Sequence, residues 1–555
     1  MRITDTSDLW WKNAVIYCLD VKRYADSDGD GWGDFVGLSR KVDYLADLGV
    51  TCIWLMPFYP SPLQDDGYDI SDFYNVDPRL GSLGDVVDFL RTAHDRGIRV
   101  IADLVPNHTS VEHPWFQSAR KGPDSPFHDW YVWSDDPPPV APADVAFPGE
   151  ETSIWQYDEE CGRYFLHRFY RFQPDLDVSN PEVRNELTKI AGFWTELGID
   201  GFRMDAVPAF LQTDDDAERA RLPDPHDFLR DLRAYLGRRR GETFLLGEAN
   251  LPHDQQRKFF GDGSSPELSG SFDFITMAHL WLSMARGEAA PLAHAVESRP
   301  EIPPECQWAT FVRNHDELTL DRLTPSERNE VFAAFGPKKS MQVYNRGLRR
   351  RLAAMLGGDN DRLRLALSLL FTLPGTPVMF YGDELGMGEN LAAKGRLAVR
   401  TPMQWTSGRN GGFSTAPAND LVSTVVRGEL GPKGVNARDQ RSDPESLHSY
   451  VRALIRVYRE CPELGWGSFS LLACEAPSVL AHQCVWEDRT LVVLHNLADA
   501  PVTASVQLPS GRGPVELAEP LGTRTVTSDK AGQVTVKLGR YGSLWLRPTD
   551  VHHSE

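Results

Sequence analysis

Residues 180–205 decide the fold, and they read NPEVRNELTKIAGFWTELGIDGFRMD. Asn180 and Pro181 are typical of the N-cap and the first position of a helix. Apolar residues then recur at spacings of three and four, and Gly198 is the residue type that commonly ends a helix. A short apolar run that ends in Asp205 follows almost at once. The stretch therefore predicts a helix joined to a buried strand, the repeating half of a parallel βα fold.

The same alternation recurs along the chain. Short apolar runs precede helical periodicity at residues 14–21, 51–58, 99–105, 200–207, 243–248, 272–277, 310–313 and 377–381. Eight such units predict an α/β protein built on a closed (β/α)8 TIM barrel, with functional side chains at the C-terminal ends of the strands.

Two segments depart from this alternation. Residues 109–180 follow the third strand and are rich in proline and tryptophan. A structureless loop of that length is unusual, so we expect an inserted domain, domain B. Residues 465–555 alternate as short strands and predict an all-β sandwich, domain C, which we expect to pack against the barrel rather than to bind carbohydrate. The barrel, domain A, then occupies residues 1–108 and 181–464.

Composition excludes several classes of protein. The 555 residues carry 58 Lys and Arg against 79 Asp and Glu, a net charge of −21. Such a surface repels phosphate backbones, so nucleic acid is not an expected partner. No apolar run has the length of a membrane span or a signal peptide, and the seven cysteines lack CxxC pairs. The sequence predicts a cytoplasmic enzyme without a membrane partner or zinc. No glycine-rich phosphate loop supports a kinase.

Three carboxylates lie where predicted barrel strands end: Asp205 after the fourth, Glu248 after the fifth and Asp316 after the seventh. A carboxylate in such a place is costly unless it is paired, hydrogen-bonded or functional. Salt bridges at the barrel mouth would explain any one of them. Three together, with histidine and arginine beside them, favour a catalytic site.

Glycoside chemistry with retained configuration needs two of these groups. One carboxylate attacks the anomeric carbon, and a second protonates the leaving oxygen and later deprotonates the acceptor, with the two roughly 5–5.5 Å apart. Neighbouring strands can supply that separation. Arg203 shares a strand face with Asp205 and should hold it ionised, whereas Glu248 needs a raised pKa.

Four ordered motifs carry a family resemblance. They are DLVPNH at 103–108, GFRMD at 201–205, GEAN at 247–250 and RNHD at 313–316, and QPDLD at 173–177 adds a fifth. Their order and placement resemble the α-amylase superfamily, glycoside hydrolase family 13, over the whole chain. The resemblance implies that Asp205 is the nucleophile and Glu248 the acid/base. It also implies that Asp316 stabilises the distorted sugar.

The resemblance also implies a closed subsite for one glucose unit. The residues implied to line it are Tyr68, Asp69, His108, Arg203, His315 and Arg400. Asp69 and Arg400 resemble the pair that grips the terminal hydroxyls in exo-acting members. That pair would favour small α-glucosides over internal attack on starch.

Within the superfamily the chain most resembles the trehalose synthases, which interconvert maltose and trehalose. Stretches 313–320 (RNHDELTL) and 381–388 (YGDELGMG) are among those that carry this resemblance, and Glu317 resembles part of that group's lid, although an ordinary surface carboxylate is an equal alternative. Residues 19–24 and 212–218 depart from that pattern on the acceptor side. An α-glucosidase or small-oligosaccharide amylase, by hydrolysis or transglucosylation, is therefore the alternative reading. A non-catalytic barrel scaffold is a remote one.

Expected ligands are maltose, trehalose and short malto-oligosaccharides, with no organic cofactor. The sequence is compatible with a homo-oligomer as well as with a monomer. A glycine-bent acidic loop predicts a structural Ca²⁺, or Mg²⁺, held by Asp26, Asp28, Asp30, Trp32 and Asp34. A solvated acidic turn is the alternative. A second site would use Asn107 and Asp175, with Gln212 where the resembling enzymes place a glutamate.

Overall fold

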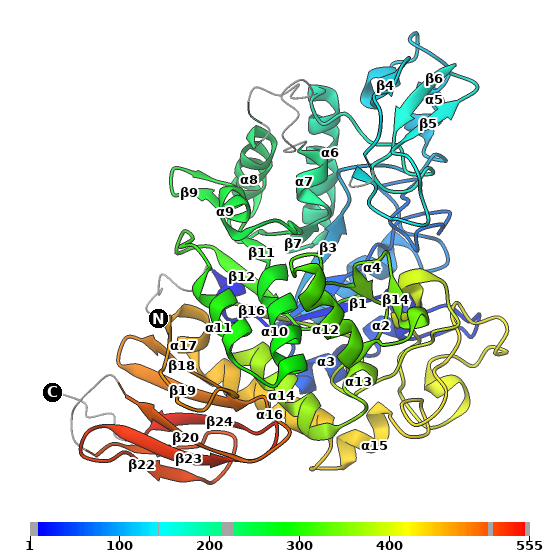
Figure 1. Ribbon diagram of the computed structural model, residues 1–555. Helices are drawn as coiled ribbons and strands as arrows, with labels where there is room; N and C mark the ends of the chain where they lie inside the picture. Colours follow the sequence, from blue (N-terminus) through cyan, green and yellow to red (C-terminus); the bar gives the residue numbers. More distant parts are fainter. Residues whose placement is uncertain (1–8, 142–143, 212–223, 225, 509–513, 550–555) are drawn as a thin grey trace.

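Eight parallel strands close into a barrel in the computed structural model, which describes residues 9–141, 144–211, 224, 226–508 and 514–549. Each strand pairs with the next along the chain, and the last pairs with the first (Figure 1). The strands are β1 (Ile16–Leu19), β2 (Cys52–Leu55), β3 (Arg99–Leu104), β7 (Gly201–Met204), β8 (Phe244–Gly247), β11 (Gly270–Phe272), β12 (Gln307–Phe311) and β16 (Thr376–Phe380). The predicted TIM barrel is confirmed.

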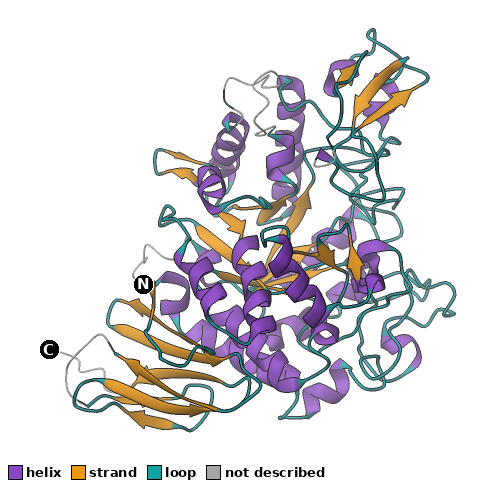
Figure 2. Cartoon of the chain, viewed as in Figure 1, coloured by secondary structure: helices purple, strands orange, loops and turns teal. Residues whose placement is uncertain are grey.

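Helices surround the barrel and bury their apolar faces against it (Figure 2). The longer ones are α3 (Val42–Leu48), α4 (Leu83–His94), α6 (Pro181–Leu197), α8 (Asp227–Arg239), α10 (Phe274–Arg286), α11 (Ala290–Glu297), α12 (Pro325–Phe335), α14 (Asn360–Thr372) and α16 (Leu447–Glu460). Shorter ones are α1 (Val21–Tyr24), α2 (Phe35–Ser39), α7 (Val207–Phe210), α9 (His253–Gln256), α13 (Leu352–Met355), α15 (Ala437–Ser442) and α17 (Pro462–Trp466).

Helix α6 follows the local signals of its sequence. The side chain of Asn180 accepts a hydrogen bond from the backbone N–H of Glu182 at 2.9 Å, which satisfies one of the free donors of the first turn. Gly198 ends the helix at φ 119°, a left-handed conformation that favours glycine. The chain then enters β7.

The sixth and seventh strands begin earlier than predicted. Strand β11 covers Gly270–Phe272 instead of residues 272–277, because Asp273 caps helix α10 by accepting a hydrogen bond from the backbone of Thr276 at 2.9 Å. Strand β12 covers Gln307–Phe311, so Asp316 follows it on a loop instead of ending it.

The segment between β3 and α6 forms a small unit above the barrel mouth (Figure 1). It contains α5 (Pro114–Ala119) and a three-stranded sheet of β4 (Trp133–Ser134), β6 (Arg163–Leu166) and β5 (Trp155–Asp158). Phe116, Trp133 and Phe165 form its aromatic core. A bridge between His108 and Asp175 joins the end of this unit to the loop after β3.

The C-terminal strands form two packed sheets around a separate apolar core. The larger contains β17 (Ser468–Leu471), β18 (Val479–Trp486), β19 (Arg489–Asn496), β24 (Ser543–Pro548), β21 (Glu516–Ala518) and β22 (Thr525–Thr527), and the smaller contains β20 (Val502–Gln507) and β23 (Gln533–Leu538). Trp545 packs this sandwich on the barrel, where its ring N–H donates to Ser368 of α14 at 2.8 Å.

No helix within the described residues has both the length and the apolar character needed to cross a membrane. All seven cysteines carry free thiols.

Candidate active site

Asp205 and Glu248 lie side by side at the C-terminal ends of two paired strands. Met204 of β7 is in register with Gly247 of β8, so the next residue on each strand is one of the two carboxylates. The backbone N–H of Glu248 donates to the carbonyl of Met204 at 3.0 Å, which extends the pairing by one residue. Ala206 then turns the chain with a φ of 46° and donates its N–H to Glu248 Oε2 at 3.2 Å.

Arg203 holds the two carboxylates together. Its Nη2 atom lies 2.6 Å from Oε2 of Glu248, and its Nη1 atom contacts Asp205 and lies 2.7 Å from Oδ1 of Asp103. The guanidinium is 1% exposed and stacks on the ring of Trp54. One buried cation therefore fixes the positions of three carboxylates, which is how a preorganised site holds groups that would repel one another.

The pKa values of the two carboxylates differ in the direction that a nucleophile and an acid require. Burial raises the pKa of Glu248 to about 7, with Arg203 opposing and the charges of Asp205 and Asp316 adding to the rise. Burial also raises the pKa of Asp205, to about 6, despite its contact with Arg203. Burial therefore outweighs Arg203 at both residues, and the pKa of Asp205 stays above its ordinary value.

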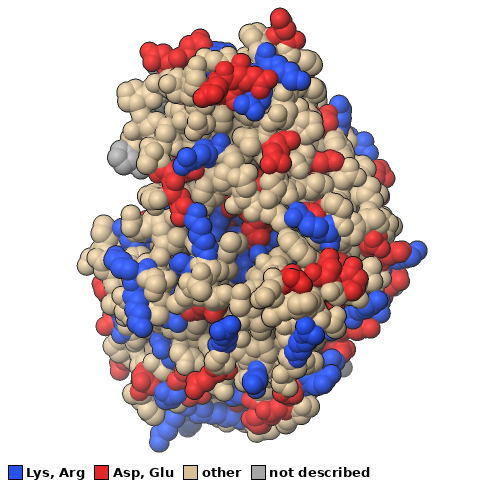
Figure 3. All heavy atoms as spheres, turned by 90° about the vertical axis from the view of Figure 1, so that its right-hand side faces the viewer, with Lys and Arg blue, Asp and Glu red and all other residues tan. Residues whose placement is uncertain are grey.

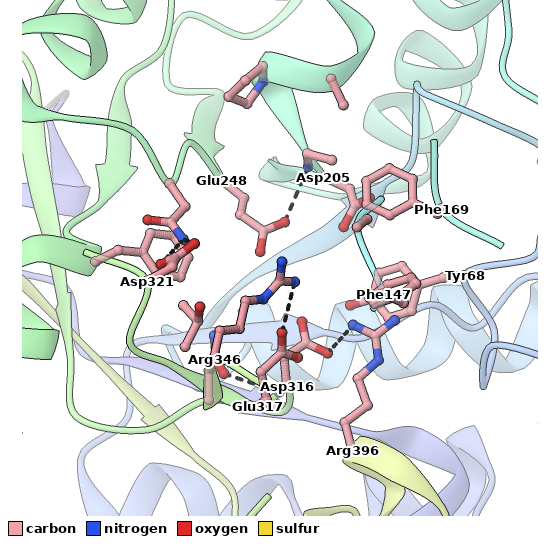
Figure 4. A pocket seen from close by; sticks show the side chains of 18 of the residues that line it. Tyr68, Phe147, Phe169, Asp205, Glu248, Asp316, Glu317, Asp321, Arg346 and Arg396 are labelled. Carbon is pink, nitrogen blue, oxygen red and sulfur yellow. Dashed lines mark hydrogen bonds and ion pairs between the residues drawn. The ribbon is translucent and has the colours of Figure 1, made fainter. Parts of the chain in front are cut away.

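Asp316 faces this pair across the cavity (Figure 4). Its Oδ1 atom lies 2.8 Å from both Arg396 Nη1 and Arg400 Nη2. Burial alone would raise the pKa of Asp316, but Arg396 and the other cations around it hold that pKa well below its usual range. Asp316 is thus ionised at every physiological pH. His315 lies 3.2 Å away and is neutral, because burial lowers its pKa well below the ordinary value.

The predicted pairing of Asp69 with Arg400 is wrong. Asp69 accepts hydrogen bonds from Ser61 and from two backbone N–H groups of its own loop, and it does not border the cavity. Arg400 instead pairs with Asp66 at 2.8 Å. The hydrogen bonds of Asp69 hold the shape of its own loop. The carboxylates that pair with Arg396 and Arg400 are Asp65 and Asp66, which precede the GYD motif.

Asp65 and Arg396 are the pair that borders the cavity, and the sequence did not reveal them. Arg396 Nη2 lies 2.8 Å from Asp65 Oδ1, and the guanidinium lies 5.2 Å from the ring centroid of Phe147. Their sequence signal is weak, because Asp65 lies in a turn and Arg396 in a short 3-10 helix, Gly395–Val399, and neither segment has an apolar periodicity. The available clue is that each stands four residues before a recognised motif residue, Asp65 before Asp69 and Arg396 before Arg400.

The cavity has a volume of about 300 Å³, at the small end for ligand pockets. Predicted residues that line it are Tyr68, His108, Asp205, Glu248, Asp316 and Glu317. Further lining residues include Phe147, Phe169, Asn250, Asp321, Arg346 and Arg396. Arg203, His315 and Arg400 stand behind this layer and contact its members. Acidic and basic side chains both lie in the hollow that divides the face seen in Figure 3.

Apolar rings and a hairpin form the rim. Strands β13 (Leu318–Thr319), β15 (Gly347–Leu348) and β14 (Gln342–Val343) make a small sheet beside the cavity. Arg346 in its turn lies 3.2 Å from Glu317. Tyr344, in the same turn at φ 53°, packs its ring against Phe147 with the two centroids 4.9 Å apart. Its hydroxyl lies 3.1 Å from that of Tyr170. The barrel hairpin and the inserted unit thus meet over the pocket.

The acidic loop brings together part of its predicted ligand set. Carboxylate oxygens of Asp26, Asp28 and Asp34 all lie within 4.8 Å of one another. Asp30 is outside this group, and its carboxylate accepts the backbone N–H of Trp32 at 2.7 Å. The loop supplies a compact set of hard oxygen donors, which suits Ca²⁺ or Mg²⁺.

The second predicted cation site is already paired within the protein. The side-chain N–H of Asn107 donates to Asp175 at 3.0 Å, and Arg168 lies 3.4 Å from the same carboxyl group. Burial raises the pKa of Asp175 to about 7. Gln212 and the 212–218 segment lie outside the described residues.

The chain is similar in sequence to a known protein family and to several known proteins. The alpha-amylase catalytic domain family matches residues 17–333 and 338–467. A trehalose synthase of Thermus thermophilus is 42% identical over 92% of this chain and 53% of that protein, so the chain spans about half of its length. A trehalose synthase of Pimelobacter sp. (strain R48) is 38% identical over 98% of this chain and 96% of that protein.

Among solved structures, the trehalulose synthase from Pseudomonas mesoacidophila MX-45 has a TM-score of 0.76 and 27% identity. The match covers 97% of this chain and 99% of that one.

Proposed function

The chain belongs to the alpha-amylase family, and we propose that it is a retaining enzyme that interconverts maltose and trehalose through a covalent glucosyl-enzyme. The observation that carries this proposal is the single guanidinium of Arg203, which holds Asp205 and Glu248 at the ends of neighbouring strands. Two carboxyl groups held this closely leave no room for a water between nucleophile and sugar, as retention requires.

In the first step the carboxylate of Asp205 attacks the anomeric carbon of the bound α-glucosyl unit. Glu248 donates its proton to the glycosidic oxygen as that bond breaks, so a neutral glucose leaves. The glucosyl unit is then held as an ester on Asp205. Asp316, kept ionised by Arg396 and Arg400, accepts hydrogen bonds from sugar hydroxyls and stabilises the positive charge that develops on the ring.

In the second step the released glucose turns and attacks the same anomeric carbon through its own 1-hydroxyl. Glu248, now ionised, takes the proton of that hydroxyl, and the ester bond to Asp205 breaks. Each of the two steps inverts the anomeric carbon, so the α-configuration is retained overall. A small cavity under a rim of aromatic side chains favours this return over escape. The substrate class is therefore small α-glucosides, with maltose and trehalose as the pair.

A structural Ca²⁺ held by Asp26, Asp28 and Asp34 is part of this proposal, with Mg²⁺ as the alternative ion. The ion would organise the loop after α1 and take no part in bond breaking. Asn107 and Asp175 suit a cation less well, because Arg168 already places a positive charge against Asp175.

The free thiols of the described residues support a cytoplasmic location.

The test is a chromatographic time course of the purified protein with maltose alone, beside an Asp205→Asn control. The proposal expects trehalose to accumulate ahead of free glucose. Glucose or glucosylated maltose as the main product would make the protein an α-glucosidase or transglucosylase. Activity in the Asp205→Asn control at the wild-type level would overturn the assignment of the nucleophile.

A further inference from the structure

Two neighbouring cavities lie on the outside of the barrel, between helix α3 and helices α15 and α16. The first, of about 530 Å³, is lined by Arg40, Lys41, Trp405, Arg438 and Arg441 among others. The second, of about 820 Å³, is lined by Arg452, Arg456 and Arg459 of α16 together with residues of α3. An ion pair of 2.8 Å between Arg441, beside the first cavity, and Asp47, beside the second, shows that they adjoin.

These cavities concentrate positive charge in a chain whose net charge is −21. Within the described residues, six of the seven cations that line them make no ion pair with a carboxylate: Arg40, Lys41, Arg438, Arg452, Arg456 and Arg459. The acidic side chains nearby are few. Asp43 pairs with Arg96, Asp47 pairs with Arg441, and Glu460 stands at the end of α16.

The first cavity has a formed wall. Nζ of Lys41 lies 4.2 Å from the ring centroid of Trp405, and the backbone N–H of Arg438 donates to the carbonyl of Trp405 at 3.0 Å. Trp405 is 5% exposed, and its ring N–H donates to the carbonyl of Tyr24 at 2.7 Å. The ring of Trp405 is therefore held in place. Burial lowers the pKa of Lys41, and the charges of Arg438 and Arg441 lower it further.

Buried His448 lies near an arginine of each cavity, Arg441 and Arg452. Its two ring nitrogens have no hydrogen-bond partner among the described residues, although the side chain is only 3% exposed. Burial lowers its pKa to about 4, and the charges of Arg441 and Arg452 act in the same direction. One arginine beside each cavity therefore acts on His448, and the carboxylate of Asp47 opposes them.

We propose that this α3–α15–α16 groove binds the phosphate groups of a phosphorylated small molecule, with Lys41 and Arg438 as the central contacts. Guanidinium and ammonium groups that converge on one concavity are the donors that phosphate oxygens prefer. The first cavity has three cations without a carboxylate partner in the part of the chain that the structure describes, and a phosphomonoester offers up to about two negative charges and a diphosphate more. A monocarboxylate offers less.

The size of the groove narrows the ligand class. The first cavity has room for a sugar phosphate, with the second beside it for a further phosphate group. Arg452, Arg456 and Arg459 follow one another at spacings of four and three, so they lie on the same face of α16. The site is separate from the catalytic pocket, and it rests on no part of the proposed reaction.

Isothermal titration calorimetry of the full chain at low ionic strength tests the proposal. The probes are inorganic phosphate, pyrophosphate and glucose 6-phosphate, with sodium acetate as the carboxylate comparison. We expect saturable binding of pyrophosphate or glucose 6-phosphate, and none of acetate. Preference for glucose 6-phosphate over pyrophosphate would indicate a sugar phosphate as the ligand, and the reverse a diphosphate.

Paired variants locate the site. Lys41→Gln with Arg438→Gln should weaken binding at least about tenfold, while Arg238→Gln should leave it unchanged, because Arg238 is an exposed arginine at the end of α8, away from the groove. Unchanged melting temperature and circular dichroism would show that the double variant is folded. Absence of binding in the wild type, equal binding in the double variant, or stronger binding of duplex DNA than of any small phosphate would each overturn the proposal.

Discussion

The Nη2 atom of Arg396 lies 2.8 Å from one carboxylate oxygen of Asp65 and 3.1 Å from the other. The same guanidinium reaches Asp316 at 2.8 Å through Nη1 and stacks near Phe147. One arginine thus joins the loop after β2, the catalytic loop after β12 and the inserted unit. Nη2 of Arg396 binds Asp65 and Nη1 binds Asp316. The ammonium group of a lysine has a single nitrogen and cannot make both contacts in this geometry.

Replacing Arg396 with lysine should therefore lower kcat/KM for maltose by roughly 10- to 100-fold, because it leaves Asp65 or Asp316 without its partner. Initial rates over a range of maltose concentrations measure the effect. Arg349→Lys is the matched control, since Arg349 contacts backbone oxygens of residues 391 and 393 outside the pocket. Equal kcat/KM in the two variants would show that Arg396 does not position the substrate.

Asp205→Asn and Glu248→Gln should each lower kcat on maltose by roughly 10³-fold or more. The two losses differ in their dependence on the leaving group. Glu248→Gln should regain much of its first-step rate on 4-nitrophenyl α-glucoside, because nitrophenolate leaves without protonation, whereas Asp205→Asn should stay inactive. A burst of nitrophenol followed in the spectrophotometer distinguishes them. If both variants recover alike, the roles of the two residues are assigned wrongly.

The rate should depend on pH as a bell. Asp205 must be ionised to attack, so kcat/KM falls as pH drops through its pKa of about 6. Glu248 must be protonated to release the leaving group, so kcat/KM falls as pH rises through about 7. The pair titrates together, and the maximum lies between the two limbs. With 4-nitrophenyl α-glucoside as substrate, the fall in kcat/KM at alkaline pH should be smaller, because nitrophenolate leaves without a proton from Glu248. A flat profile from pH 5 to pH 8 would contradict this account.

Calcium should raise the melting temperature through the acidic loop. At a free Ca²⁺ concentration 100 times the Kd, a site present only in the folded state adds about 2.7 kcal/mol to the free energy of unfolding. Asp28→Asn should abolish the shift. Asp30→Asn should retain it, because that carboxylate lies outside the group formed by Asp26, Asp28 and Asp34. Differential scanning calorimetry with EDTA and with Ca²⁺ measures both, and equal loss in the two variants would place Asp30 among the ligands.

We expect Tyr344, which packs against Phe147 at the rim, to help the pocket exclude water. Tyr344→Ala removes the ring that packs against Phe147, so the share of maltose converted to glucose should rise several-fold over wild type. Tyr344→Phe keeps the ring and loses only the hydroxyl contact with Tyr170, so its product ratio should stay near wild type. Chromatography of both reaction mixtures decides, and an unchanged ratio in Tyr344→Ala would remove this rim contact from the mechanism.

Much of the fold could be predicted because its signals are local. The helix that begins after Asn180 carries its own cap, apolar face and terminating glycine. The two carboxylates that we propose as catalytic follow buried strands, so the topology of a barrel alone places Asp205 beside Glu248. Where the prediction of strand six failed, Asp273 was read as part of an apolar run although it caps a helix.

The pocket wall was harder to predict because its contacts join distant loops. Asp65 and Arg396 are 331 residues apart and neither stands in a periodic segment. Asp69 looked like the partner of an arginine because it belongs to a recognisable motif, yet backbone N–H groups of its own loop occupy it. Such assignments depend on which of several adjacent carboxylates a loop turns inward, and only the folded loop decides that.

The register between β7 and β8 also constrains how this chain can diverge. Asp205 and Glu248 are each the first residue beyond a paired position, Met204 opposite Gly247. Insertion or deletion of one residue within either strand would turn its carboxylate to the opposite face. The loops that begin at Ala206 and Ala249 carry no such restriction, so homologues with new acceptors should differ in the length of these loops while the two strands keep theirs.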